Sequence, residues 1–178
     1  MTDQGPTVPG ARSRSGTAPI SGVRLAAGGD APAVAGAIEQ LLVELGGQRP
    51  SSVELETAAR ELIEDPEAGL VLVAEKGGEL VGVLAASWQQ AVHVPGRYAT
   101  IQDLWVLPAW RSRAIGHDLI DALCELASEQ GVARLEVGLP KESFERLGST
   151  ESFYRANGFS HLGPRMRRLL GDGGPADE

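Results

Sequence analysis

The fold of this chain is decided by the stretch VLPAWRSRAIG, which covers residues 106–116. Residues 97–107 are predicted to form a strand, which ends at Pro108 because proline has no backbone N–H to donate to a sheet. Residues 112–130 are predicted to form a long helix, since their apolar side chains recur every three to four positions. A strand therefore leads through a short basic turn into a helix, and the remaining elements are placed around it.

That turn has the chemistry of a phosphate site. The first backbone N–H groups of a helix have no partner within the helix, and the helix dipole is positive at this end. Small residues let phosphate oxygens reach these groups, and Arg111 and Arg113 add positive charge. The turn predicts a cradle for a pyrophosphate, with an ordinary basic start of a helix as the alternative interpretation.

Outside the turn, strands and helices alternate in a mixed pattern. Strands are expected over residues 23–26, 70–74, 80–88, 97–107, 134–139 and 159–170, and helices over residues 30–46, 53–64, 112–130 and 149–157. Asp30 is expected to cap the first helix, while Ser51 and Glu54 have the spacing of a capping box. Gly77 and Gly78 predict a two-residue hairpin turn. The order β-α-α-β-β-β-α-β-α-β is that of an α/β domain with a mixed sheet (α+β).

Residues 23–170 are predicted to form one domain between two disordered tails, residues 1–22 and the acidic residues 171–178, which are poor in large apolar side chains. The chain has 178 residues, of which 42% are hydrophobic and 22% charged, as in globular proteins. The single Cys124 excludes an intramolecular disulfide and a multi-cysteine zinc site. The histidines show no metal-ligand spacing, so no metal is expected.

Charge and hydropathy exclude further classes of function. A net charge of -8 argues against nucleic acid as a partner, because phosphate backbones need a basic surface. No apolar run approaches the roughly 18 residues of a membrane span, and no secretory signal is seen, so a cytoplasmic protein without a membrane partner is expected. The charge is uneven, since residues 30–79 sum to -8 and residues 97–170 to +1. The acidic half would attract a cationic ligand.

Two motifs resemble the GNAT family of N-acetyltransferases. The pattern R-x-x-A-x-G of residues 111–116, which follows V-x-P, is similar to the family's acetyl-coenzyme A signature. The family prefers glycine where this chain has Ala114. FYRANGF, residues 153–159, is similar to the family's late F-Y-x-x-x-G-F segment. With the matching order of elements, the resemblance covers the ordered chain and implies a single GNAT-like domain with a splayed central sheet.

The resemblance implies acetyl-coenzyme A as the co-substrate. The turn would hold the pyrophosphate, the preceding strand would pair with the pantetheine arm through backbone groups, and a late asparagine would reach the arm. The cofactor-binding residues implied in this way are Leu104, Trp105, Val106, Arg111, Ser112, Arg113, Ala114, Ile115, Gly116, His117 and Asn157.

The resemblance also implies catalytic roles. The backbone N–H of Val106 would stabilise the oxyanion, and Tyr154 would protonate the leaving thiolate, because an ordinary tyrosine pKa near 10 exceeds that of a thiol. Asp103 would hold a cationic amine or relay its proton through water, since the amide of Gln102 is no base. Both side chains reach the cleft only if the strand has a bulge, as it often has in the family. Core packing for Tyr154 and pairing with an arginine for Asp103 are the alternatives.

The predicted reaction is direct acetyl transfer to a primary amine in a ternary complex. The acidic helices at residues 30–46 and 53–64 would border the acceptor entrance, which favours a small cationic acceptor resembling a polyamine or an aminoglycoside. A protein N-terminal or lysine acetyltransferase is the second hypothesis. A regulatory module that binds coenzyme A without turnover is the third, motivated by Ala114 and Gln102. The last predicted strand is a candidate for pairing in a homodimer.

Overall fold

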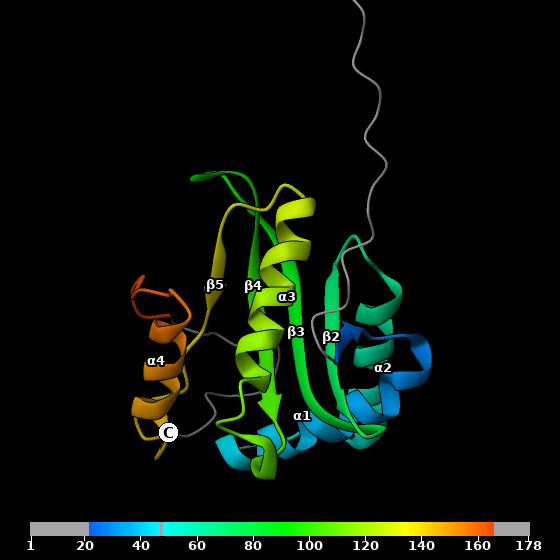
Figure 1. The fold of residues 1–178 in the computed structure, drawn as a ribbon. Coiled ribbons are helices and arrows are strands. Elements are labelled where there is room, and N and C mark those ends of the chain that lie inside the picture. The colour runs from blue at the N-terminus through cyan, green and yellow to red at the C-terminus, as the bar shows by residue number, and fades with distance from the viewer. Residues whose placement is uncertain (1–21, 47, 166–178) are drawn as a thin grey trace, which may run out of the picture.

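A computed structural model describes residues 22–46 and 48–165 of the chain. This part is a mixed α/β domain with five strands and four helices (Figure 1), which confirms the predicted fold class. Its strands are β1 (Val23–Leu25), β2 (Gly69–Lys76), β3 (Glu79–Ala91), β4 (Val94–Val106) and β5 (Leu135–Val137). Its helices are α1 (Ala31–Leu45), α2 (Ser52–Glu64), α3 (Ile115–Glu129) and α4 (Leu147–Ala156), with short 3-10 turns at Gly28–Asp30 and Pro108–Trp110.

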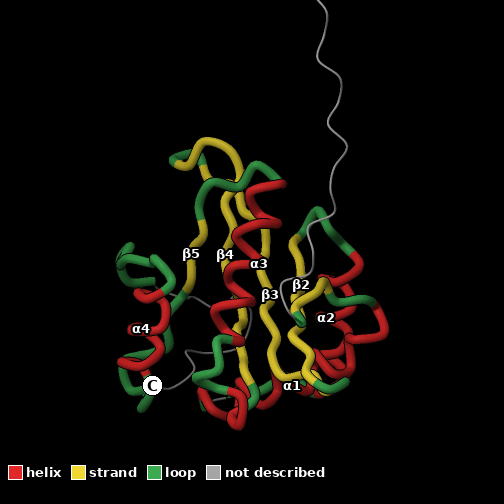
Figure 2. Tube along the Cα trace, viewed as in Figure 1, coloured by secondary structure: helices red, strands yellow, loops and turns green. Residues whose placement is uncertain are grey.

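The strands form one sheet in the order β1-β2-β3-β4-β5 (Figure 2). Neighbours from β1 to β4 run antiparallel, and β5 runs parallel to β4. The turn between β2 and β3 consists of Gly77 and Gly78, which have φ angles of 60° and 82°. Two positive φ angles in a two-residue hairpin are the geometry for which glycine is preferred, so this predicted turn is confirmed.

The sheet is buried on both faces. Leu70 and Leu72 of β2 pack in one core cluster with α3, and Val71 and Val73 pack in a second cluster with α1. Alternate residues of a strand point to opposite faces, so a strand covered on both sides is apolar throughout. Figure 1 shows α3 across one face of the sheet, with α1 and α2 on the other side.

The sheet opens between β4 and β5. The two strands pair only from Ala99 to Ile101 of β4 and from Leu135 to Val137 of β5, while β4 continues to Val106. A bulge lies at the same place, because Ile101 and Asp103 oppose consecutive residues of β3 and leave an extra residue between them. The expected splay and the expected bulge are therefore both present, and they free one edge of β4 for a site.

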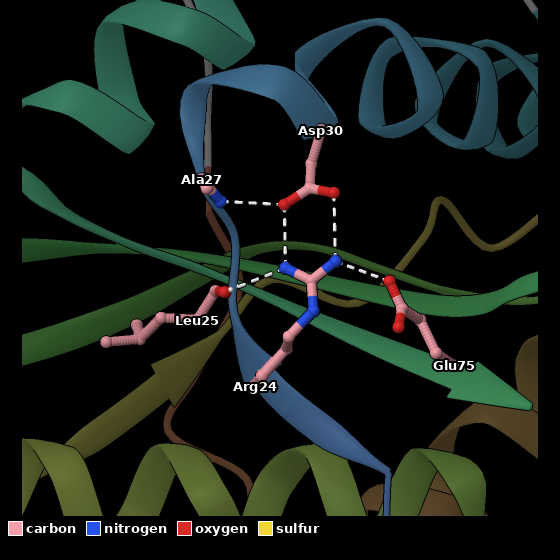
Figure 3. A network of polar contacts seen from close by, with 5 residues as sticks. All are labelled: Arg24, Leu25, Ala27, Asp30 and Glu75. Carbon is pink, nitrogen blue, oxygen red and sulfur yellow. Dashed lines mark hydrogen bonds and ion pairs between the residues drawn. The ribbon is translucent and has the colours of Figure 1, made fainter. Parts of the chain in front are cut away.

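The capping box predicted at the start of α2 is present. The backbone N–H of Ser51 donates to the Glu54 carboxylate at 2.8 Å, and the backbone N–H of Glu54 donates to Ser51 Oγ at 3.3 Å. Asp30 occupies the N-cap position of α1 as predicted, but its side chain makes no capping hydrogen bond to that helix. Its carboxylate accepts from the backbone N–H of Ala27 at 2.7 Å and binds Arg24, which also pairs with Glu75 (Figure 3).

Two further expectations are corrected. The long helix begins at Ile115 rather than at residue 112, because residues 112 and 114 have positive φ angles. Residues 159–165 do not form the first half of the predicted last strand, and Pro164 has no N–H for a ladder there. The rest of that strand, with the dimer contact it was expected to make, lies outside the described residues, as do residues 1–21 and 171–178 of the predicted tails. Across the described ranges, no helix has the length and apolarity needed to cross a bilayer.

Candidate active site

A cavity of about 730 Å³ lies along the free edge of β4. Its walls come from the end of α1, from β4, from the turn before α3, from the segment after β5 and from α4. The predicted site residues that line it are Asp103, Leu104, Trp105, Val106, Arg111, Ser112, Ala114, Ile115, Gly116, His117, Tyr154 and Asn157. Of the predicted set, only Arg113 is absent from its walls.

The turn that opens α3 is strained. Ser112 and Ala114 have φ angles of 60° and 64°, which are unusual for residues other than glycine and cost about 1–2 kcal/mol each. Successive backbone N–H groups in such a turn form a concave anion site, and no side chain among the described residues caps α3. Strain of this kind is typical of functional sites. A left-handed conformation also explains a preference for glycine at the position of Ala114.

The two arginines of the turn have protein partners. Arg111 Nε donates to the carbonyl of Val106 at 2.9 Å, and its Nη2 donates to Glu44 Oε1 at 2.5 Å. The guanidinium of Arg113 lies 5.1 Å from the ring centroid of Trp110, in a cation–π contact. Both arginines are thus held by protein partners, and the backbone N–H groups at the start of α3 are further donors that this turn presents.

Glu44, at the end of α1, is a cavity residue that the motifs did not reveal. Its carboxylate accepts from Trp105 Nε1 at 3.2 Å and from Arg111, and Arg146 Nη1 lies 3.5 Å from it. These partners are 61, 67 and 102 residues away along the chain. In the sequence, Glu44 stands only as a carboxylate between Leu41 and Leu45 of the apolar helix face. Such a pattern is too common to indicate a site.

Tyr154 is a buried residue of α4, with 8% of its surface exposed. Its ring makes edge contacts with Phe153 and Phe159, at centroid distances of 5.2 and 5.4 Å. Burial, with a smaller contribution from the charge of Asp103, raises the pKa of Tyr154 to about 12. The core packing considered as an alternative is present, yet the residue also lines the cavity and keeps its proton throughout the neutral range.

Asp103 lies beside the bulge of β4. Burial raises the pKa of its carboxyl group above the usual 3.8, and no ion pair to it occurs among the described residues. The alternative of an arginine-paired Asp103 is therefore not seen. Because of the bulge, the neighbouring Gln102 also lines the cavity, where its Nε2 donates to Ser87 Oγ at 2.6 Å.

His117 and Asn157 join α3 to α4 across the cavity. Asn157 Nδ2 donates to the carbonyl of Phe153 at 2.8 Å, so its Oδ1 accepts, at 2.5 Å, from Nδ1 of His117. This hydrogen bond raises the pKa of His117, with Asp121 adding to the effect. Gly116 permits the close approach of the two helices, because a Cβ there would lie 3.0 Å from the ring of Phe153. That close contact with α4 is a packing reason for glycine at this position.

The part of the chain that the structure describes contains no group of three or more His, Cys, Asp or Glu side chains placed to hold a metal ion. Besides the Glu44–Arg111 ion pair, the cavity brings together the Asp103 carboxyl group, the protonated phenol of Tyr154 and the backbone N–H groups at the start of α3. A carboxyl group with a raised pKa beside a phenol that stays protonated is a suitable pair for moving protons to and from a reacting molecule.

Comparisons with known proteins identify a matching family and similar folds. The model of the acetyltransferase (GNAT) family matches residues 38–159. A search of curated proteins gave no match. A putative acetyltransferase from Arthrobacter sp. FB24 is 28% identical, with a TM-score of 0.68 over 88% of this chain and 96% of that chain.

Two more distant solved structures share the fold. A ribosomal-protein-alanine N-acetyltransferase from Brucella melitensis biovar Abortus 2308 is 21% identical, with a TM-score of 0.66 over 84% of this chain and 98% of that chain. An aminoglycoside acetyltransferase from an uncultured soil metagenomic sample is also 21% identical, with a TM-score of 0.66 over 84% of this chain and 95% of that chain.

Proposed function

Because this chain belongs to the acetyltransferase (GNAT) family, we propose that it transfers an acetyl group from acetyl-coenzyme A to the primary amine of a small molecule. The amine attacks the thioester directly while both substrates are bound. The observation that carries this proposal is that Asp103, Tyr154 and the uncapped start of α3 line one cavity. A donor cradle, a proton acceptor and a proton donor are the parts that such a transfer needs.

The cavity fits the co-substrate that the family implies. The N–H groups at Ala114–Gly116 would hold its pyrophosphate, and the free edge of β4 would pair with the amide groups of its pantetheine arm. The backbone N–H of Val106 would stabilise the negative charge that develops on the thioester oxygen. Arg111 supports this strand end, since its Nε binds the carbonyl of the same residue.

Two side chains would move the protons. Asp103, with a raised pKa, would hold the incoming ammonium group and accept a proton from it, directly or through water. Tyr154, with a pKa of about 12, would donate its proton to the sulfur as the thioester bond breaks. Burial disfavours a charged thiolate as well, so the sulfur accepts a proton more readily inside the cavity than in water.

The acceptor would carry its positive charge at the reacting amine. The polyamine-like or aminoglycoside-like acceptor favoured by the acidic sequence needs several carboxylates at the entrance. No residue of α2 lines the cavity, and the carboxylate that α1 contributes, Glu44, is already bound by Arg111. Asp103 is then the carboxylate left to bind an ammonium group. One of the structures that share this fold is an aminoglycoside acetyltransferase, an enzyme with a small-molecule acceptor.

The two other hypotheses predict different results in one experiment. Free thiol is measured from acetyl-coenzyme A in the presence of alkylamines, diamines, amino acids, aminoglycosides and short peptides, and products are identified by mass. A small-molecule enzyme acetylates members of the first four groups, whereas a protein N-terminal enzyme requires the peptides. Binding of acetyl-coenzyme A in calorimetry without thiol release for any amine would leave the regulatory module and overturn the proposed function.

A further inference from the structure

We propose that the preferred acceptor is zwitterionic, a small amine that also carries a carboxylate, and that Arg146 binds this carboxylate. This inference rests on the proposed function, since it takes the cavity to be the place where the acceptor binds. It starts from the charges that line the cavity and from the partners that each of them already has.

Five side chains in the cavity wall can carry a charge: Glu44, Asp103, Arg111, His117 and Arg146. Glu44 and Arg111 form a close ion pair of 2.5 Å and cancel each other. The ring of His117 is held by partners on α3 and α4. Of the remaining two, Asp103 has no ion pair among the described residues, and Arg146 has only a long contact of 3.5 Å with Glu44, which Arg111 already neutralises. A ligand with an ammonium group and a carboxylate matches both.

Arg146 is available for a ligand. Half of its side chain is exposed, and the one contact that the described residues offer its guanidinium is Glu44 Oε2, at 3.5 Å. Glu44 has closer donors in Arg111 and Trp105, so it stays paired if Arg146 turns to an incoming carboxylate. An arginine can then form two parallel hydrogen bonds with that carboxylate, the strongest geometry available to it.

Arg146 also lies on the correct side of the sheet. It is near the end of α1, whose residues pack with Trp105 in the core cluster opposite α3. Asp103 faces the same side, because Ala85, its partner across the strands, belongs to that cluster. Asp103 and Arg146 therefore share the side of the sheet that α1 covers, and Arg111, which also binds Glu44, lies between Arg146 and the N–H groups at the start of α3.

The test compares acceptors that differ only in the carboxylate. Alanine is paired with alaninamide, and β-alanine with propylamine, and kcat/KM is measured by thiol release at saturating acetyl-coenzyme A. We expect kcat/KM of the better zwitterion to exceed that of its partner without the carboxylate by about 10- to 100-fold. This factor corresponds to the free energy of hydrogen bonds to a charged group. In Arg146→Gln this advantage disappears through a higher KM for the zwitterion, while the rate with the amide or alkylamine is retained. Arg146→Lys keeps part of the advantage.

The control is Arg155→Gln, which removes an arginine of α4 that pairs with Glu151 outside the cavity. It should behave as wild type with every acceptor. Equal kcat/KM for zwitterions and their partners in the wild type would overturn the inference and leave the acetyltransferase intact. So would a tenfold weaker affinity for acetyl-coenzyme A in Arg146→Gln, because the arginine would then serve the phosphates. Failure of every amine to release thiol would overturn the proposed function and this inference together.

Discussion

Asp103 on β4 and Tyr154 on α4 line the same cavity, and the charge of Asp103 adds to the effect of burial on the tyrosine, whose pKa rises to about 12. The two groups thus interact through space although they are 51 positions apart in the sequence. Each holds a proton more tightly than it would in water. This coupling is the basis of the first two predictions.

Tyr154→Phe removes a hydroxyl group and almost no volume. We expect kcat to fall by about 10²–10⁴, the usual contribution of a general acid, with the affinity for acetyl-coenzyme A unchanged. Because the pKa of Tyr154 is about 12, loss of its proton should cause no decline of the wild-type rate below about pH 11. An unchanged kcat in the variant, measured where chemistry limits the rate, would exclude this role.

Asp103→Asn should lower the activity of the protein and raise its stability. The raised pKa means that the folded protein binds this proton more tightly than the unfolded chain, so wild-type stability falls as the pH rises above the ordinary 3.8 and through the raised pKa. Asparagine carries no charge to bury, so the variant should have a higher Tm at pH 7, and the difference should shrink toward low pH. Its kcat/KM should fall by about 10²–10⁴. A less stable but fully active variant would contradict both parts.

Ala114→Gly tests the strained turn. Glycine takes a φ of 64° without the cost that alanine incurs, although it loses about 0.5–1 kcal/mol through the greater freedom of the unfolded chain. The free energy of unfolding, measured in urea, should therefore stay equal or rise by up to about 1.5 kcal/mol. Ala58→Gly, at an exposed position within α2, is the matched control and should lose about 1 kcal/mol. Equal losses in both variants would show that residue 114 is not strained.

Asp30→Asn tests the contact of Asp30 with Arg24 (Figure 3). The guanidinium of Arg24 and the N–H of Ala27 lower the pKa of Asp30 to about 2. A lowered pKa stabilises the fold above the ordinary value of 3.8, and this contribution is lost as the pH falls toward 2. The variant should be about 0.5–1 kcal/mol less stable at pH 7, a small effect because the pair is partly exposed, and the gap should narrow between pH 4 and 2. A gap that is constant with pH would point to a cause other than this charge.

The sequence predicted what depends on neighbours along the chain. The glycine turn after Lys76 and the capping box at Ser51 are each set by a few consecutive residues and are present in the structure, and so is the turn that leads from β4 into α3. The expected bulge at β4 is also present, and with it Asp103 lines the cavity. Strand periodicity alone places Gln102 and Asp103 on opposite faces of the sheet. The bulge that brings both to the cavity was expected only from the resemblance to the family.

The unpredicted features join residues that are distant along the chain. The contacts of Glu44 with Trp105, Arg111 and Arg146 depend on how α1 packs on the sheet, and no spacing encodes them. The position of the acidic residues relative to the cavity also depends on helix packing. The acidic sequence of residues 30–79 therefore suggested a polycationic acceptor, although no carboxylate of α2 lines the cavity. Residues 159–165 form no strand, and Pro164 interrupts this segment. The strand was predicted from the apolar residues there, and the effect of the proline was given too little weight.

The central claim is that the cavity containing Asp103 and Tyr154 is the active site. The most direct test compares the rate of thiol release by the wild type with that of a variant that lacks both side-chain groups. Initial rates are measured for the wild type and for a folded Asp103→Asn/Tyr154→Phe variant, with acetyl-coenzyme A and the best amine of the panel, and thiol formation is matched to acetylated product by mass. We expect amine-dependent release by the wild type and a loss of at least about 10²-fold in the double variant, with acetyl-coenzyme A still bound. Equal amine-dependent rates for the two proteins would contradict the assignment of this cavity as the active site.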